Sequence, residues 1–308
     1  MTISDTQSGL LFAGATAVCW SCSAFTFSRS SRQVGSLAVN IIRLIVAALF
    51  FSIYGYCVRG KCLPTDASLH TWGWLSLSGF TGFFLGDLFL FRSFSEIGVR
   101  LSMLIMSLAP VFVAVTGWLW LSETMSARHL IGMAVTISGV MWVIMERPVK
   151  GPQQSNHVSL KGIAYAALGA AGQGLGVVIG KYGMISQSGT QTHIYDPFAA
   201  TQIRTYAGIL SFALLIAYLG RTKDVLKACH HLKPMTYITI GALFGPFLGV
   251  ALLMRSIQLI PSGISQTIAA TVPVLLIPVA IVVDKEKVTL QSLIGTAVAI
   301  GGVGILSW

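Results

Sequence analysis

The sequence predicts an all-α polytopic membrane protein, with ten transmembrane helices arranged as two inverted five-helix repeats. Of its 308 residues, 54% are hydrophobic and only 10% are charged, whereas an average soluble domain carries about 25% charged residues. Ten apolar stretches approach the roughly 20 residues that a helix needs to cross a bilayer, where the backbone must satisfy its own hydrogen bonds. The second half of the chain also repeats the first. We therefore expect the lipid bilayer to surround most of this protein.

The apolar stretches follow one another with short polar connections. We expect a first repeat at 9–146, a linker at 147–159 and a second repeat at 160–308. The N-terminus lacks the basic segment of a secretory signal peptide, so its first helix should be retained. The ten predicted helices cover 9–27, 37–58, 72–94, 99–121, 129–145, 160–179, 198–219, 235–257, 263–283 and 290–308.

The internal repeat is visible when the chain is compared with itself. A shift of 163 residues holds without a gap from about Gly82 to Val140, and a shift of 161 pairs Arg43 with Arg204. Five helices are an odd number, so the second repeat must enter the membrane in the opposite sense to the first. Such inverted repeats are a route to alternating access. The shift of 163 pairs Gly82 with Gly245, Arg92 with Arg255, Ser102 with Ser265, Pro110 with Pro273 and Glu123 with Glu286.

Several segments carry a resemblance to a known family. They include NIIRLIVAALFF, LGDLFLFRSFSEIG, LAPVFVAVTGWLWLSET, HLIGMAVTISGVMWV, VPVLLIPVAIVVDKEKV and LIGTAVAIGGVGIL. Over nearly its whole length the chain resembles the EamA branch of the drug/metabolite transporter superfamily. The resemblance implies two five-helix repeats and transport of small metabolites, with a leaning towards export. The chain departs from the family where Ser122 and Lys285 precede glutamates, since glycine often stands there.

Composition argues against several other functions. The net charge of +10 comes from basic residues scattered in short loops beside helix ends, so anionic lipid headgroups are the expected counter-charge and nucleic acid is not. Cys19 and Cys22 form a C-x-x-C without a second ligand pair, which predicts no metal site. Neither a G-x-G-x-x-G motif nor a P-loop is present, so we expect no cofactor and no ATP hydrolysis. Gly172, Gly176 and Gly180 instead suit close helix packing.

Three charged residues lie deep in the predicted helices. Arg43 and Arg204 each stand six residues from a helix start, or about 9 Å deep. Asp87 is the only carboxylate deep in a helix, and it matches the depth of Arg43. Because pairing would lower the cost of burying each charge, we predict an Arg43–Asp87 salt bridge. Its role is either structural or one of gating or proton coupling.

Arg204 has no such partner in the second half, where Val250 replaces the aspartate. Gln173 and Gln266 lie towards the same surface, so the cation and amides together are a candidate site for a substrate carboxylate or phosphate. Alternatively, Arg204 binds backbone carbonyls. Trp20 and Thr267 are further candidates for lining a cavity, with ordinary interhelical contacts as the alternative.

Two prolines and two glutamates complete the candidates. Pro110 and Pro273 interrupt predicted helices and are candidate hinges, although many proline kinks are static. Glu123 and Glu286 precede the last helix of each repeat. We expect each of them to stabilise the positive N-terminal end of the helix that follows, a structural role.

The predicted function is secondary transport of small organic solutes, amino-acid-like or drug-like, as an exporter in the cell membrane. A channel or a facilitative uniporter without ion coupling is the alternative, and a membrane enzyme would need a catalytic set at depth that the sequence does not offer. Substrate, coupling ion and oligomeric state stay open. Orientation does too: thirteen basic residues follow odd-numbered helices and five follow even-numbered ones, which predicts both termini outside, whereas the resemblance implies termini inside.

Overall fold

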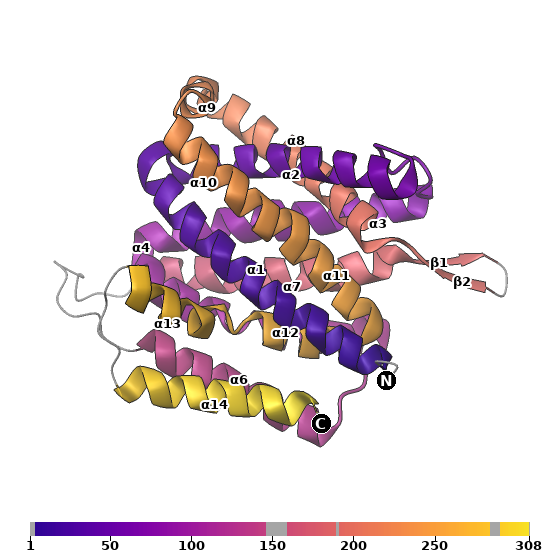
Figure 1. The fold of residues 1–308 in the computed structure, drawn as a ribbon, viewed down its shortest axis with the longest axis vertical. Helices are drawn as coiled ribbons and strands as arrows, with labels where there is room; N and C mark the ends of the chain where they lie inside the picture. Colours follow the sequence, from indigo (N-terminus) through magenta and orange to yellow (C-terminus); the bar gives the residue numbers. More distant parts are fainter. Residues whose placement is uncertain (1–3, 146–158, 189–190, 284–289, 308) are drawn as a thin grey trace.

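The computed structural model describes residues 4–145, 159–188, 191–283 and 290–307. The predicted linker at 147–159 falls almost wholly outside these residues, as does Glu286. The described part forms one bundle of helices, and α1 begins on the same side of the bundle on which α14 ends (Figure 1). The helices of the first half are α1 (Asp5–Val34), α2 (Ser36–Arg59), α3 (Leu69–Gly79), α4 (Asp87–Met106), α5 (Ala109–Leu121) and α6 (Ala127–Met145).

The second half follows the same plan, with a hairpin and a short helix added and with the two helices α11 and α12 in the place of α4. Its helices are α7 (Leu160–Met184), α8 (Pro197–Tyr218), α9 (Thr222–Cys229), α10 (Leu232–Ala242), α11 (Val250–Leu259), α12 (Ser262–Ala269), α13 (Val272–Val283) and α14 (Leu290–Ser307). A hairpin of β1 (Ile185–Ser188) and β2 (Gln191–Ile194), paired from Ile185 with Ile194, projects from the bundle (Figure 1). The sequence analysis predicted neither the hairpin nor the short helix α9.

Local sequence sets several helix ends. Ser4 and Gln7 form a reciprocal capping box at the start of α1, with bonds of 3.1 and 3.2 Å. Asp196 caps α8 by accepting from the backbone N–H of Ala199 at 2.8 Å, and Pro197 follows at the first helical position. Gly60 ends α2 in the left-handed region at φ 66°.

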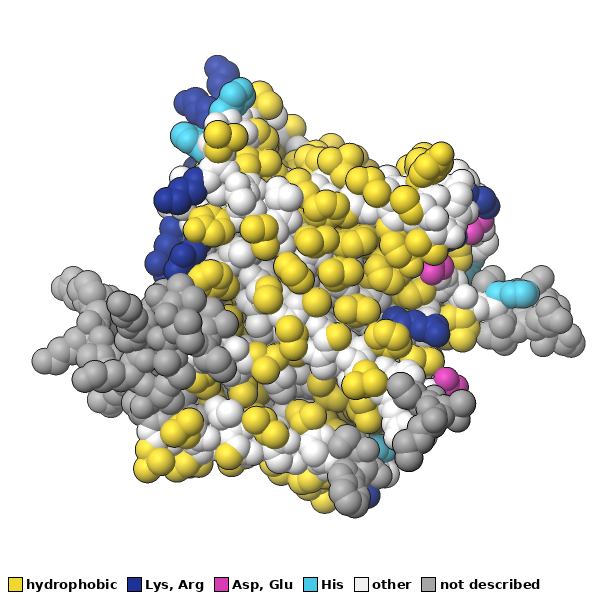
Figure 2. All heavy atoms as spheres, viewed as in Figure 1, with side chains coloured by type: hydrophobic (Ala, Val, Ile, Leu, Met, Phe, Trp, Pro, Cys, Tyr) yellow, Lys and Arg dark blue, Asp and Glu magenta, His cyan; other side chains and the backbone are white. Residues whose placement is uncertain are grey.

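The helices are long and apolar enough for a multi-pass integral membrane protein. Within the described residues, eight helical spans have the length and composition to cross a membrane, and two shorter apolar helices cover Ser262–Ile277 and Leu293–Leu306. Figure 2 shows hydrophobic side chains over the middle of the visible face, while Lys and Arg gather at the edge where α9 lies. This distribution is the one expected of a bundle whose sides contact lipid.

Two predicted helix boundaries were wrong. The prediction ended one helix at residue 94 and began the next at 99, but α4 runs through this region and the break falls at Ser107 and Leu108. The prediction of one unbroken helix over 263–283 was also wrong, because α12 and α13 are separated at Ala270 and Thr271. Both breaks stand just before a proline, Pro110 or Pro273. Each proline is the second residue of the helix that follows, α5 or α13. There its missing backbone donor is tolerated, because the first turn of a helix leaves its N–H groups unpaired, so both prolines favour a new helix that begins at these positions.

Two π-helical segments were not predicted either. They are η1 (Phe80–Gly86) and η2 (Leu243–Gly249), exactly matched under the same shift of 163 residues that aligns the sequence. The wider π turn is rare and is often found at functional sites. Here η1 brings Phe83 and then Asp87 to the centre of the bundle, and η2 contains Pro246.

Glycines let the two halves approach closely at η1. An added Cβ at Gly176 would lie 2.7 Å from the Cα of Gly82, and one at Gly172 would lie 3.1 Å from the carbonyl oxygen of Thr81. The prediction that this glycine series serves close helix packing is thereby confirmed. α7 consequently lies against the segment that carries Asp87.

Candidate functional site

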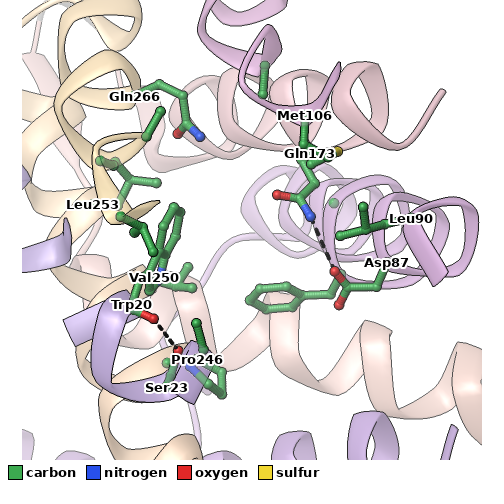
Figure 3. A pocket seen from close by; sticks show the side chains of 18 of the residues that line it. Trp20, Ser23, Asp87, Leu90, Met106, Gln173, Pro246, Val250, Leu253 and Gln266 are labelled. Carbon is green, nitrogen blue, oxygen red and sulfur yellow. Dashed lines mark hydrogen bonds between the residues drawn. The ribbon is translucent and has the colours of Figure 1, made fainter. Parts of the chain in front are cut away.

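A cavity of about 310 Å³ lies between the two halves of the chain. Residues of α1, α2, η1, α4, α5 and α6 line it from the first half, and residues of α7, α8, η2, α11, α12 and α13 from the second. Figure 3 shows Gln173 and Asp87 on one wall, with Leu253 and Gln266 on the opposite one. Side chains from both halves therefore converge at this cavity.

The first wall holds a largely buried ion pair, with side-chain exposures of 17% for Arg43 and 12% for Asp87. Arg43 Nη2 donates to Asp87 Oδ2, so the predicted salt bridge is present. Gln173 Nε2 donates to Asp87 Oδ1 at 3.2 Å (Figure 3). The guanidinium of Arg43 also lies 5.3 Å from the ring centroid of Phe27. Gln173, which was expected to serve a site together with Arg204, lines the same cavity as Arg204. Its hydrogen bond goes to Asp87, because α7 packs against η1 and the start of α4.

Arg204 is buried on α8 and is only 3% exposed. Its Nη1 lies 3.0 Å from the sulfur of Met254, and its guanidinium carbon lies 5.0 Å from the ring centroid of Phe83. Its Nε is buried without a partner in the described part of the chain. No carbonyl oxygen among the described residues accepts from it, so the alternative in which Arg204 binds backbone carbonyls does not hold there. The cation is held by a thioether and an aromatic ring, both weak partners.

Gln266 and Trp20 line the second wall, as the sequence analysis predicted. Gln266 is 4% exposed, and its Oε1 has no hydrogen-bond partner among the described residues. Trp20 fits because Gly249 lies beside it: an added Cβ there would come within 2.5 Å of the indole Cδ1. Thr267 was predicted wrongly. It does not line the cavity, and its hydroxyl donates to the carbonyl of Gly263 at 2.7 Å within its own helix.

Most of the remaining lining is apolar. Such walls favour a ligand with a sizeable apolar part, while the few polar groups fix its orientation. Pro273 lines the cavity, whereas Pro110 is buried in α5 and does not. The sequence analysis had not identified the apolar lining, which includes Phe27, Phe83, Leu90, Met103, Met106 and Val177.

A second polar site joins the two halves at the face of the bundle on which α1 begins. We call it the Glu123 cluster, and it consists of Glu123, Lys181 and Ser262. Glu123 Oε1 lies 2.7 Å from Lys181 Nζ and accepts from the Ser262 hydroxyl at 2.8 Å, and Oε2 accepts from the Ser262 backbone N–H at 2.8 Å. Lys181 also donates to the carbonyl of Ile260 at 3.4 Å. The cluster lies near the start of α1, where Ser256 donates to the carbonyl of Gly9 at 2.7 Å.

The expected position of Glu123 was therefore wrong. Its carboxylate stabilises the N-terminal end of α12 in the second half, instead of the N-terminal end of α6 that follows it in sequence. Nothing in the sequence indicated this contact, because Ser262 is 139 residues away. The Glu123 cluster closes the bundle between α5, α7 and α12.

Comparison with known proteins agrees with this architecture. A model of the EamA-like transporter family matches residues 7–145 and again residues 160–308. No match was found among curated proteins. Among solved structures, one described only as the crystal structure of a protein has a TM-score of 0.72 with 16% sequence identity, over 97% of this chain and 96% of that one. At that identity the likeness concerns the fold alone. With both halves matched by the family model, the chain belongs to the EamA-like transporter family.

Proposed function

We propose that this protein is a secondary transporter that moves small organic solutes, amino-acid-like or drug-like in size, by alternating access between two inverted repeats of five helices. The observation that carries the proposal is the central cavity, to which both halves contribute side chains while the Glu123 cluster joins them at one face. A site shared by two moving halves is what alternating access requires. We propose export as the direction, because the family resemblance implies export more often than uptake.

Features shared by the halves support the inverted repeat. The π-helical segments and the proline-associated helix breaks occur at positions 163 residues apart. Arg43 lies near the start of α2, at the face where α1 ends, and Arg204 lies near the start of α8, at the opposite face. Equivalent residues thus stand near opposite faces, as expected if the second repeat is inverted.

The experiment is solute counterflow in vesicles that contain the purified protein. Vesicles are loaded with one unlabelled solute from a panel of amino acids, aromatic monocarboxylates and lipophilic cations, and uptake of the same labelled solute is followed. A transporter produces a transient accumulation of label above equilibrium. Flux without that accumulation, and without saturation, would support the channel alternative.

A cross-link provides the matched control for this assay. In a background in which the five native cysteines are replaced by serine, Glu123→Cys and Ser262→Cys place two thiols on opposite halves within the Glu123 cluster. We expect counterflow to fall on oxidation of the double variant and to return on reduction, while each single variant is insensitive to oxidant. Full counterflow in the cross-linked protein would contradict alternating access through this face.

A further inference from the structure

The charges around the cavity do not balance. Of the described residues that line it, three carry a charge: Arg43, Asp87 and Arg204. Arg43 and Asp87 neutralise each other as an ion pair, so the cavity has a net charge of +1 from Arg204. An uncompensated buried cation is costly in a region of low dielectric constant. One negative charge brought in by a ligand would remove that cost.

The surroundings of Arg204 leave the guanidinium available to such a ligand. Within the described residues its only hydrogen-bond acceptor is the sulfur of Met254, a weak one, and its Nε is buried without a partner. Phe83 covers the guanidinium through a cation–π contact that supplies no acceptor oxygen. Carboxylate oxygens match the planar donor fork of arginine and form its strongest hydrogen bonds.

The number of charges discriminates between anionic groups. A monocarboxylate would bring the net charge of the cavity to zero. A phosphate monoester, which carries close to two negative charges at neutral pH, would leave an excess negative charge beside Asp87. A zwitterion such as an amino acid would leave the cavity positive, since its own ammonium group cancels its carboxylate. The charge balance thus favours a carboxylate without an accompanying cation.

Gln266 adds a second polar requirement. Gln266 lines the cavity, and its Oε1 is buried without a donor among the described residues. Figure 3 shows its amide on the wall opposite Gln173. A buried acceptor without a donor destabilises the protein, because it has lost its hydrogen bonds to water. A neutral hydroxyl on the solute would supply the missing donor without changing the charge balance.

We propose that Arg204 and Gln266 form a substrate subsite for hydroxylated organic monocarboxylates with an apolar body, Arg204 binding the carboxylate and Gln266 the hydroxyl. Aromatic and aliphatic walls such as Trp20, Phe83 and Leu90 receive the apolar body. This inference rests on the proposed transport function and specifies its substrate class.

The test uses five probes that share one phenyl group: 3-phenyllactate, 3-phenylpropanoate, 3-phenylpropanamide, phenylalanine and phenethyl phosphate. Binding to the purified full-length protein is measured by titration calorimetry. We expect 3-phenyllactate to bind most tightly and the amide at least about tenfold more weakly, since a hydrogen bond to a charged group contributes roughly 1.5–3 kcal/mol. Equal binding of 3-phenylpropanoate and 3-phenylpropanamide would overturn the carboxylate assignment. Tighter binding of phenylalanine or of the phosphate would overturn the substrate class.

Variants assign the roles of the two residues. Arg204→Gln should lower affinity for 3-phenyllactate about tenfold or more and leave that for the amide unchanged, and Arg204→Lys should retain part of it. Gln266→Met should remove the advantage of 3-phenyllactate over 3-phenylpropanoate. If Arg204→Gln still prefers 3-phenyllactate to the amide as wild type does, the role of Arg204 is contradicted. If Gln266→Met still prefers 3-phenyllactate to 3-phenylpropanoate, the role of Gln266 is contradicted. Since Arg204→Gln could fail to fold, its elution and unfolding temperature are checked against wild type, and Gln266→Met tests the site with Arg204 intact.

Binding and flux together separate this inference from the transport proposal. If the anion binds selectively but no probe shows counterflow, the subsite stands and transport fails. If 3-phenylpropanamide and 3-phenylpropanoate bind alike and both show counterflow, the transport proposal stands and the proposed carboxylate subsite does not.

Discussion

Glu123 of the first half and Lys181 of the second form an ion pair across the bundle, with 2.7 Å between Oε1 and Nζ and side-chain exposures of only 10% and 16%. The carboxylate also accepts two hydrogen bonds from Ser262 at the start of α12. One side chain thus connects α5, α7 and α12 at a single face. Under the alternating-access cycle proposed above, opening of that face would require this contact to break.

The Glu123–Lys181 pair should be energetically coupled. Glu123→Gln removes the charge that compensates Lys181, so the free energy of unfolding should fall by about 1–3 kcal/mol. Lys181→Met alone should also destabilise the protein, and the double variant should lose less than the sum of the two. Thermal unfolding of the four proteins in detergent measures the coupling. Strictly additive losses would mean that the ion pair contributes nothing to closing this face.

Asp87 should be more sensitive to neutralisation than an exposed carboxylate. Asp87→Asn leaves Arg43 buried without a negative partner among the described residues, a loss expected to cost roughly 3–5 kcal/mol. The matched control is Asp66→Asn, which breaks the pair between Asp66, in the loop after α2, and Arg59, the last residue of α2. This change should cost about 1 kcal/mol or less. Equal losses in unfolding experiments would contradict the buried role of Asp87.

A separate measurement tests proton coupling by Asp87. If Asp87 carries the proton, Asp87→Asn should abolish the response of solute flux to an imposed pH gradient while counterflow persists. Arg43→Met combined with Asp87→Leu should recover much of the stability without recovering the pH response. A variant Asp87→Asn that still follows the gradient would exclude Asp87 as the proton carrier.

Lowering the pH should reduce the contribution that Asp66, in the loop between α2 and α3, makes to the free energy of unfolding. Burial alone would raise the pKa of Asp66, but a hydrogen bond to its own backbone N–H, the charge of Arg59 and the hydroxyl of Tyr195 at 3.2 Å together lower it. A carboxyl whose folded pKa is depressed stabilises the fold above its unfolded pKa of about 3.9 and loses that contribution as the pH falls through the folded value.

The stability difference between wild type and Asp66→Asn should therefore be present at pH 7 and shrink below about pH 4. Chemical unfolding of both proteins across this range measures it. A difference that is the same at both ends of the range would mean that Asp66 is not held ionised by these partners.

Sequence reasoning located the Arg43–Asp87 pair because both residues are costly to bury and lie at equal depth on consecutive helices. Depth along a helix is a property of the sequence alone, so it could be predicted. The isolation of Arg204 followed in the same way from Val250. By contrast, Thr267 was misplaced because depth does not say which face of α12 looks into the cavity.

Other features depend on packing that the sequence does not encode locally. Glu123 binds Ser262 across 139 residues, and no periodicity links the two positions. The π-helical segments η1 (FTGFFLG) and η2 (LFGPFLG) are apolar, like the α-helices beside them, so an apolar pattern does not distinguish them. Pro110 itself indicates the break that precedes it, whereas the predicted boundary lies at 95–98, where Ser95 and Glu96 interrupt the apolar pattern.

The close approach of α3 and α8 leads to the last prediction, a pair of glycine substitutions in one helix. An added Cβ at Gly79 would lie 2.2 Å from the backbone carbonyl oxygen of Arg204, which cannot move without shifting α8. Gly73, also on α3, has no heavy atom within 4 Å of an added Cβ. Gly79→Ala should therefore cost about 1–3 kcal/mol of stability or more through overpacking. Gly73→Ala should be neutral or stabilising by up to about 1 kcal/mol, because alanine restricts the unfolded chain.

Thermal unfolding of the two variants measures the difference, and binding of 3-phenyllactate shows its effect on the cavity. Because Gly79 abuts the backbone of Arg204, Gly79→Ala should weaken that binding, while Gly73→Ala should leave it unchanged. Unfolding temperatures that match in the two variants would contradict the close packing of α3 against α8. A destabilised Gly79→Ala that binds 3-phenyllactate like wild type would separate the two effects: the helices would be tightly packed there, but the position of α8 would not set the geometry of Arg204.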